Sequence, residues 1–90
     1  MSYIFKASET YWSKFYDLSN DQKASVREKW KIFKIDPFDP SLGTHKIHRL
    51  SAIAKQTVYS VVIEGNLRIL FKIDGGTINT FDLGTHDVYQ

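Results

Sequence analysis

The second half of the chain holds two short turn signals that divide it into three largely apolar runs. Gly65-Asn66 lies between "TVYSVVIE" and "LRILFKID", and Gly75-Gly76 lies between that run and "TINTFDL". Both connections consist of two residues of the kind that tight hairpin turns need. The pattern predicts three consecutive strands, each antiparallel to the next, and so restricts the possible folds to those that contain such a meander.

The first half has a different period, with apolar residues at helical spacing. Ser8 is a candidate N-cap for a first helix, and Ser19 with Gln22 has the spacing of a capping box at the start of a second. The apolar positions are Tyr11, Phe15 and Leu18 in the first helix, and Val26, Trp30 and Phe33 in the second. The segment "DPFDP" ends the second helix because proline cannot continue its hydrogen bonds. Since the link is very short, we expect an antiparallel helix hairpin.

Two further segments are candidate strands. "YIFKA" near the N-terminus and "HKIHRLS" ahead of the meander would extend the sheet to four or five strands. An antiparallel sheet commonly packs one face on helices. The predicted fold class is therefore α+β, with an N-terminal helix hairpin packed on one face of a four- to five-stranded antiparallel sheet. The 90 residues fit a single domain, residues 1–90.

The composition excludes several classes of protein. Without cysteine there is no disulfide framework and no thiolate zinc site, which favours a reducing compartment. The N-terminus lacks the apolar stretch of a signal peptide, and no run approaches the roughly 18 apolar residues of a membrane span. We expect a cytoplasmic protein with no membrane segment.

Positive charge is concentrated in residues 43–55, "GTHKIHRLSAIAK". This stretch has no acidic residue, although the formal net charge of the whole chain is only +2. Its composition suits an anionic partner such as a phosphate backbone, which makes Lys46, His48 and Arg49 candidate RNA contacts. The alternative interpretation is a solvated strand edge that charge protects from further pairing.

The alternation of "LRILFKID" divides its side chains between two faces. Leu67, Ile69, Phe71 and Ile73 share one face, which we expect to be buried against the helices. The other face carries the remaining positions of the run, which are Arg68, Leu70 and Lys72. The sequence therefore predicts an open, cationic sheet surface on the side opposite the helices, with Ser60 and Val62 of the preceding strand beside Arg68. Lys72 on this surface is a further candidate RNA contact.

Such a surface carries the groups that cleave RNA without a metal. The reaction needs a base for the 2′-hydroxyl, a cation for the crowded phosphate and an acid for the leaving 5′-oxygen. His45 precedes the meander, His86 follows its last strand and Arg68 lies between them. Histidine titrates near neutral pH and arginine offers a planar fork to phosphate oxygens. Tyr89 adds a ring for base stacking or a phenol that donates a hydrogen bond.

Other interpretations of these residues remain open. A histidine at a turn commonly caps backbone groups, which applies to His48. A metal site of His45, His48 and His86 has only a weak signature, and we expect neither a metal nor a small-molecule cofactor. Tyr89 would also serve as an ordinary C-terminal anchor on the sheet. Paired glycosidase carboxylates, a glycine-rich phosphate loop and a nucleophile elbow are absent from the sequence.

Three stretches together resemble a known family. "DPFDPSLGTHKIHRLS", "VYSVVIEGNLRILFKIDGG" and "TFDLGTHDVY" are similar to the RelE/ParE toxin superfamily of type II toxin–antitoxin modules, and most to its RelE/YafQ-like mRNA interferases. The resemblance spans nearly the whole chain, and "LGTHDVY" after a terminal strand is its most specific element. It implies a RelE-like fold, a cognate antitoxin as partner and cleavage of mRNA held on the ribosome.

The resemblance also implies a role for individual residues. Arg68 matches the strand arginine that contacts the scissile phosphate. His86 matches the position where YafQ-like toxins use a histidine as general acid, and His45 resembles their second histidine, a candidate general base. Tyr89 falls where RelE-like toxins carry an aromatic residue that stacks or assists proton transfer. Lys46 would assist by charge.

The sequence departs from the family in one respect. RelE places two lysines on the strand that matches "VYSVVIE", and this chain has Ser60 and Val62 there. A lysine-assisted mechanism is therefore not expected. The ParE branch, which inhibits DNA gyrase, generally lacks nuclease residues, so Arg68, His86 and Tyr89 favour RNA cleavage. A gyrase inhibitor and an inactive relic that only binds antitoxin are the alternatives.

Overall fold

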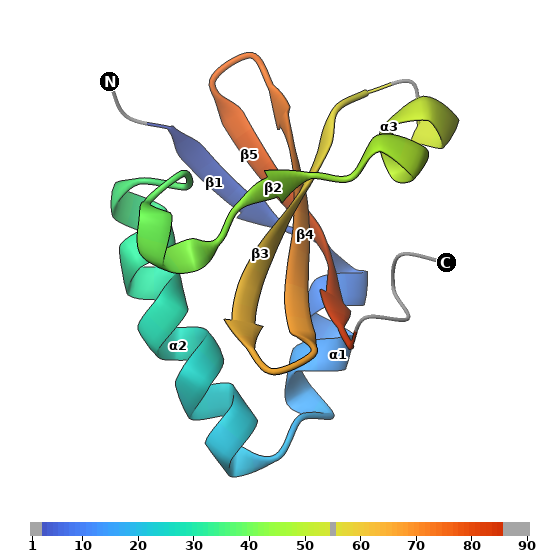
Figure 1. Cartoon of the computed structure of the whole chain (residues 1–90). Coiled ribbons are helices and arrows are strands. Elements are labelled where there is room, and N and C mark those ends of the chain that lie inside the picture. The colour runs from blue at the N-terminus through green and yellow to red at the C-terminus, as the bar shows by residue number, and fades with distance from the viewer. Residues whose placement is uncertain (1–2, 55, 86–90) are drawn as a thin grey trace.

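The described part of the chain forms two main helices, two short helical segments and five strands. The computed structural model describes residues 3–54 and 56–85 (Figure 1). The helical elements are α1 (Glu9–Tyr16), α2 (Asn20–Ile35), a 3-10 turn η1 (Pro40–Leu42) and α3 (His48–Ala54). The strands are β1 (Ile4–Ala7), β2 (His45–Lys46), β3 (Val58–Glu64), β4 (Leu67–Asp74) and β5 (Thr77–Gly84).

The five strands form one sheet in the order β1-β5-β4-β3-β2. The predicted meander β3-β4-β5 is antiparallel, and its turns are Gly65-Asn66 and Gly75-Gly76. β2 adds antiparallel to β3, whereas β1 pairs parallel with β5. The α+β class is confirmed, and the sheet is mixed rather than wholly antiparallel. No tight turn joins β1 to β5, so the connection does not dictate their relative direction.

The helix ends form as the sequence predicts. The Ser8 hydroxyl accepts a hydrogen bond from the backbone N–H of Tyr11 at 3.2 Å and so caps α1. The Ser19–Gln22 capping box has both of its hydrogen bonds, at 3.2 and 3.1 Å. The chain reverses between the helices, with α2 packed along β3 and α1 beside β5 (Figure 1).

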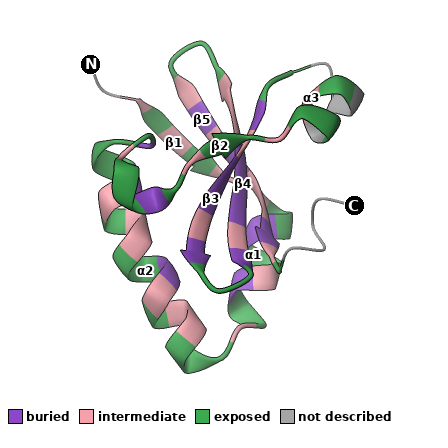
Figure 2. Cartoon of the chain, in the orientation of Figure 1, coloured by how far each residue is buried: buried purple, intermediate pink, exposed green. Residues whose placement is uncertain are grey.

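The core lies between the helices and one face of the sheet. Phe33 of α2 contacts Phe71 of β4 with ring centroids 5.0 Å apart, and Tyr59 of β3 stacks on Phe71 at 5.2 Å. Leu67, Ile69 and Phe71 are buried, as the alternation predicts, and Ile73 packs at the margin. Figure 2 shows the buried positions gathered along β3, β4 and β5 and on the inner sides of the helices.

The predicted strand "HKIHRLS" is wrong after its second residue. β2 ends at Lys46, and α3 begins at His48. The last sheet bond runs from the Ile47 N–H to the Val58 carbonyl at 2.8 Å. The Ser51 N–H then closes a helical turn on the Ile47 carbonyl at 2.9 Å, and the Ser51 hydroxyl accepts a bond from the Val58 N–H at 2.8 Å. Leu50, Ile53 and Ala54 follow helical spacing in the sequence, which was the signal for this helix.

None of the helices in the described part of the chain is long and apolar enough to cross a membrane.

Candidate nucleic-acid interface

Rows of paired residues cross the sheet face opposite the helices, and three of them hold predicted site residues. Residues directly opposite one another in a sheet place their side chains on the same face, so the strand registers define these rows. The three rows are Val62, Arg68 and Gly84; then His45, Ser60, Leu70 and Asp82; then Val58, Lys72, Asn79 and Lys6. His45 and Arg68 therefore share this face, in neighbouring rows.

This face is less open than the sequence predicts. Ser60 and Leu70, in the middle row, are 0% and 1% exposed, and Val58 is 1% exposed. Arg68 and Lys72, on either side of Leu70 along β4, are half-buried. The expected continuous cationic surface is therefore two separate cationic positions with buried residues between them. Val62 pairs directly with Arg68, as predicted, while Ser60 lies one row away.

His45 is exposed and its ring is held by the backbone. Its Nδ1 lies 3.0 Å from the Gly43 carbonyl oxygen. Because a carbonyl oxygen only accepts hydrogen bonds, the proton in this bond belongs to Nδ1, and the lone pair of the neutral ring is on Nε2. This is the tautomer that a general base requires at Nε2.

The turn before His45 is fixed by its own hydrogen bonds. Asp39 accepts bonds from the Ser41 hydroxyl at 2.7 Å and the Ser41 N–H at 2.9 Å, and these bonds lower the pKa of the Asp39 carboxyl. Gly43 then adopts a left-handed conformation with φ of 56°. A Cβ at this position would lie 3.2 Å from Val62 Cγ2. Gly43, whose carbonyl holds the His45 ring, therefore packs against Val62, and Val62 pairs with Arg68.

Arg68 is turned back toward the hairpin that precedes it. Its Nη1 donates to the carbonyl oxygens of Gly65 and Leu67, the latter at 3.1 Å. Its Nε is buried and has no hydrogen-bond partner among the residues that the structure describes. A buried donor left unpaired costs about 1–3 kcal/mol, so Arg68 retains capacity for an acceptor that approaches this face.

The basic residues around β2 gather at a different place. Lys46, His48 and Arg49 are exposed, and Lys46 pairs with Tyr59, so it belongs to the opposite face from His45. Lys46 and His48 line a hollow of about 370 Å³ beside α3. The structure therefore brings these two residues together at the β2 edge, away from the row of Arg68. No three potential metal ligands cluster within residues 3–54 and 56–85.

His86 and Tyr89 lie outside the described residues, so the structure tests neither prediction. The last residue of β5, Gly84, pairs with Arg68.

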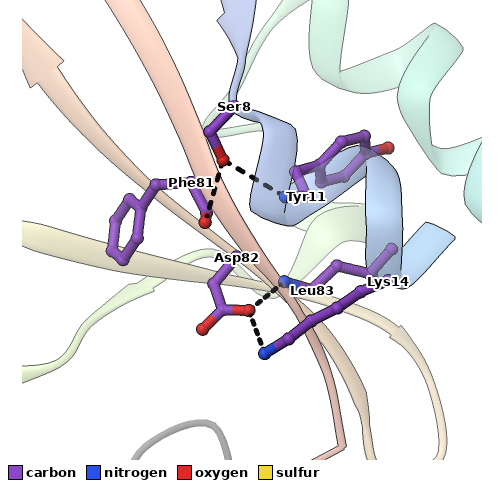
Figure 3. Close-up of polar contacts among 6 residues, drawn as sticks. All are labelled: Ser8, Tyr11, Lys14, Phe81, Asp82 and Leu83. Carbon is purple, nitrogen blue, oxygen red and sulfur yellow. Dashed lines mark hydrogen bonds and ion pairs between the residues drawn. The ribbon is translucent and has the colours of Figure 1, made fainter.

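One polar cluster near this point was not foreseen (Figure 3). Lys14 of α1 forms an ion pair with Asp82 of β5 at 2.6 Å, and the same carboxylate oxygen accepts a bond from the Leu83 N–H at 2.8 Å. The Ser8 hydroxyl donates to the Phe81 carbonyl at 3.1 Å. Together these contacts fasten α1 to the end of β5. The partners are far apart in the sequence, which carries no local signal for such pairs.

A second surface lies between α1 and α2. It is a groove of about 420 Å³, lined by Tyr11, Trp12, Phe15, Tyr16, Val26, Arg27, Trp30 and Lys31. Trp12 and Tyr16 are 43% and 66% exposed. The Arg27 guanidinium lies 5.5 Å from the centre of the Phe15 ring, and burial raises the pKa of Tyr11 to about 12. This groove is aromatic with a cationic rim.

No protein-family model and no curated protein matches the sequence. Two solved structures match the fold over nearly the whole of both chains. One is from the archaeal RelE–RelB complex of Pyrococcus horikoshii OT3, with a TM-score of 0.72 and 16% identity, covering 94% of this chain and 96% of the other. The second is from the E. coli DinJ–YafQ toxin–antitoxin complex, with a TM-score of 0.70 and 14% identity, covering 98% and 97%. The chain thus has the RelE-like fold.

Proposed function

We propose that the chain is the toxin of a type II toxin–antitoxin module and acts as an endoribonuclease on mRNA bound to the ribosome. The observation that carries the proposal is the placement of His45 and Arg68 on one face of a RelE-like fold, with Arg68 beside the end of β5. A gyrase inhibitor would need no such pair of groups.

The spacing of these two residues suits one phosphodiester. Two strand spacings and two residues along β4 separate their Cα atoms by about 12 Å. Both side chains are long enough to meet a phosphate held between them, with Arg68 exchanging its bond to the Gly65 carbonyl for phosphate oxygens. In the sequence, His86 follows Gly84, the partner of Arg68, by two residues.

The proposed mechanism uses no metal. Nε2 of His45 accepts the proton of the 2′-hydroxyl, whose oxygen attacks the adjacent phosphorus. Arg68 stabilises the negative charge that accumulates on the phosphate oxygens. His86 donates a proton to the departing 5′-oxygen, and Tyr89 stacks on a neighbouring base. Lys46, His48 and Arg49 lie at the β2 edge, where they would contact the RNA or the ribosome rather than the scissile phosphate.

The test is expression of the chain without antitoxin in the cytoplasm, with cleavage sites mapped on cellular mRNA. His86→Ala and Arg68→Ala should each lower cleavage by about 10²- to 10⁴-fold and relieve growth arrest. Lys34→Ala, an exposed residue of α2, is the matched control and should remain toxic. Full toxicity of both His86→Ala and Arg68→Ala would contradict the assignment. Inhibited gyrase supercoiling with intact mRNA would support the ParE-like alternative.

We also propose that the α1–α2 groove receives an amphipathic helix of the cognate antitoxin. The groove presents aromatic rings inside a rim of Arg27 and Lys31, which complements a helix with apolar and acidic faces. Trp12→Ala should weaken binding of the cognate antitoxin by about 30-fold or more, as expected for an aromatic anchor. Ile35→Ala, an exposed apolar residue of α2 outside the groove, is the control. Equal affinities of the two variants would exclude the groove.

A further inference from the structure

A hollow of about 470 Å³ lies on the open sheet face, away from the row of Arg68. The side chains that give it its chemistry are Lys6, Gln56, Lys72, Asp74, Asn79 and Phe81. Asn79 of β5 pairs with Lys6 of β1 on one side and with Lys72 of β4 on the other. The two ammonium groups therefore come from strands on either side of one carboxamide. Their Cα atoms are about 10 Å apart, so both can reach a single anion above Asn79.

An aromatic ring enters this hollow because of an irregularity in β5. The register shifts between Leu70 and Phe71 of β4, which leaves Phe81 as an extra residue without a partner on that strand. Such a bulge redirects a side chain. Figure 3 shows Phe81 on the side of β5 away from Tyr11 and the helices. The Lys72 ammonium lies 5.7 Å from the centre of the Phe81 ring.

The groups in the hollow match the parts of one nucleotide. Lys6 and Lys72 offer cations to a phosphate, and the Phe81 ring offers a stacking surface for a base. Asn79 and Gln56 offer amides to the polar edge of that base, and Asp74 accepts from an exocyclic amine. Lys72 lies four residues along β4 from Arg68, a distance of about 13 Å. The hollow is therefore placed to bind a different nucleotide from the one whose phosphate Arg68 contacts.

We propose that this hollow binds one nucleotide of single-stranded RNA next to the cleavage position, with its phosphate on Lys6 and Lys72 and its base on Phe81. This inference rests on the proposed function for the identity of the substrate. The other anionic ligand with suitable chemistry is an acidic peptide. Phe81 and the two amides favour the nucleotide. A base stacks on an aromatic ring and forms paired hydrogen bonds with an amide, whereas the carboxylates of an acidic peptide do neither.

The experiment measures binding rather than cleavage, so that it can fail independently of the nuclease. Purified chain is titrated with a fluorescent single-stranded RNA whose 2′-oxygens are methylated, which prevents cleavage, over a series of salt concentrations. Lys6→Ala and Lys72→Ala should each reduce the slope of log Kd against log salt by about 0.7, the value for one phosphate contact on a single strand. Lys34→Ala is the matched control and should leave the slope unchanged.

The aromatic contact has a different signature. Phe81→Ala should raise Kd by about 5- to 150-fold with the salt slope unchanged, and Phe81→Trp should retain tight binding. Unchanged slopes in both lysine variants, or no RNA binding by the wild-type chain, would overturn the inference. Lysine variants that bind RNA normally but lose antitoxin would assign the hollow to an acidic peptide. A further outcome is that the lysine and Phe81 variants give the expected changes in RNA binding while His86→Ala and Arg68→Ala stay fully toxic. That combination would support the nucleotide site and reject the catalytic assignment.

Discussion

The two faces of the sheet use their aromatic and charged residues in opposite ways. On the helix-covered face, rings pack on rings, as in the chain of contacts from Phe5 through Phe33 to Phe71. On the open face, Phe81 lies beside Lys72, and the buried Nε of Arg68 has no hydrogen-bond partner within residues 3–54 and 56–85. Close packing of buried rings stabilises a fold, whereas an aromatic ring beside a cation on an open face is available to a ligand. The first face therefore accounts for stability, and the second is the candidate for function.

The largest expected effect tests this division through stability. Phe33→Ala removes a ring that is 1% exposed and contacts Phe5, Trp30 and Phe71. The free energy of unfolding should fall by about 3–5 kcal/mol. Lys6→Ala on the open face should change it by no more than about 0.5 kcal/mol. Urea denaturation of both variants measures the difference, and similar losses would show that the two faces contribute equally to stability.

A smaller effect is expected from alkaline titration of the helix-covered side. Burial raises the pKa of Tyr11 to about 12, so the folded protein holds this proton more tightly than the unfolded chain, whose tyrosine titrates near 10. Stability is therefore fully present below pH 10 and falls as the pH rises from 10 to 12, by up to about 3 kcal/mol. Thermal unfolding of Tyr11→Phe, measured across the same pH range, should not show this loss of stability. The same alkaline loss in this variant would assign it to another group.

Local signals in the sequence predict much of the helix-covered face. The caps at Ser8 and Ser19 and the turn at Gly75-Gly76 depend on residues at most a few positions apart, and the structure has all of them. The alternation along β4 also places Leu67 and Phe71 in the core. These features form from short-range chemistry, which a single sequence records directly.

The open face is less predictable because contacts distant in sequence shape it. Pairing of β1 with β5, the Lys14–Asp82 ion pair and the bulge at Phe81 each depend on segments that only the folded sheet brings together. The alternation places Arg68 and Lys72 on this face, but it says nothing of the buried Ser60 and Leu70 between them. The sequence predicts a strand through His48, whereas this residue starts a helix, because the two-residue strand before it is too short to show a period.

Gly43 connects the two faces, and its substitution should lower stability by less than Phe33→Ala or the ionisation of Tyr11 does. The preceding residue, Leu42, is fully buried in the core, and the Gly43 carbonyl orients His45 on the open face. Gly43→Ala places a side chain in a left-handed conformation, 3.2 Å from Val62 Cγ2, and should lower the free energy of unfolding by about 1–2 kcal/mol. Gly76→Ala is the matched control, since a Cβ there meets no atom within 4 Å.

The same substitution separates stability from activity. If the Gly43 carbonyl fixes the proton of His45 on Nδ1, Gly43→Ala should reduce mRNA cleavage by about 10-fold or more at a temperature where the variant remains folded, because a misoriented base loses part of its contribution. Cleavage mapping and circular dichroism at that temperature provide the two measurements. A folded Gly43→Ala variant with the cleavage rate of Gly76→Ala would show that the orientation of His45 is unimportant. The open face would then owe its activity to Arg68 and to residues that follow β5.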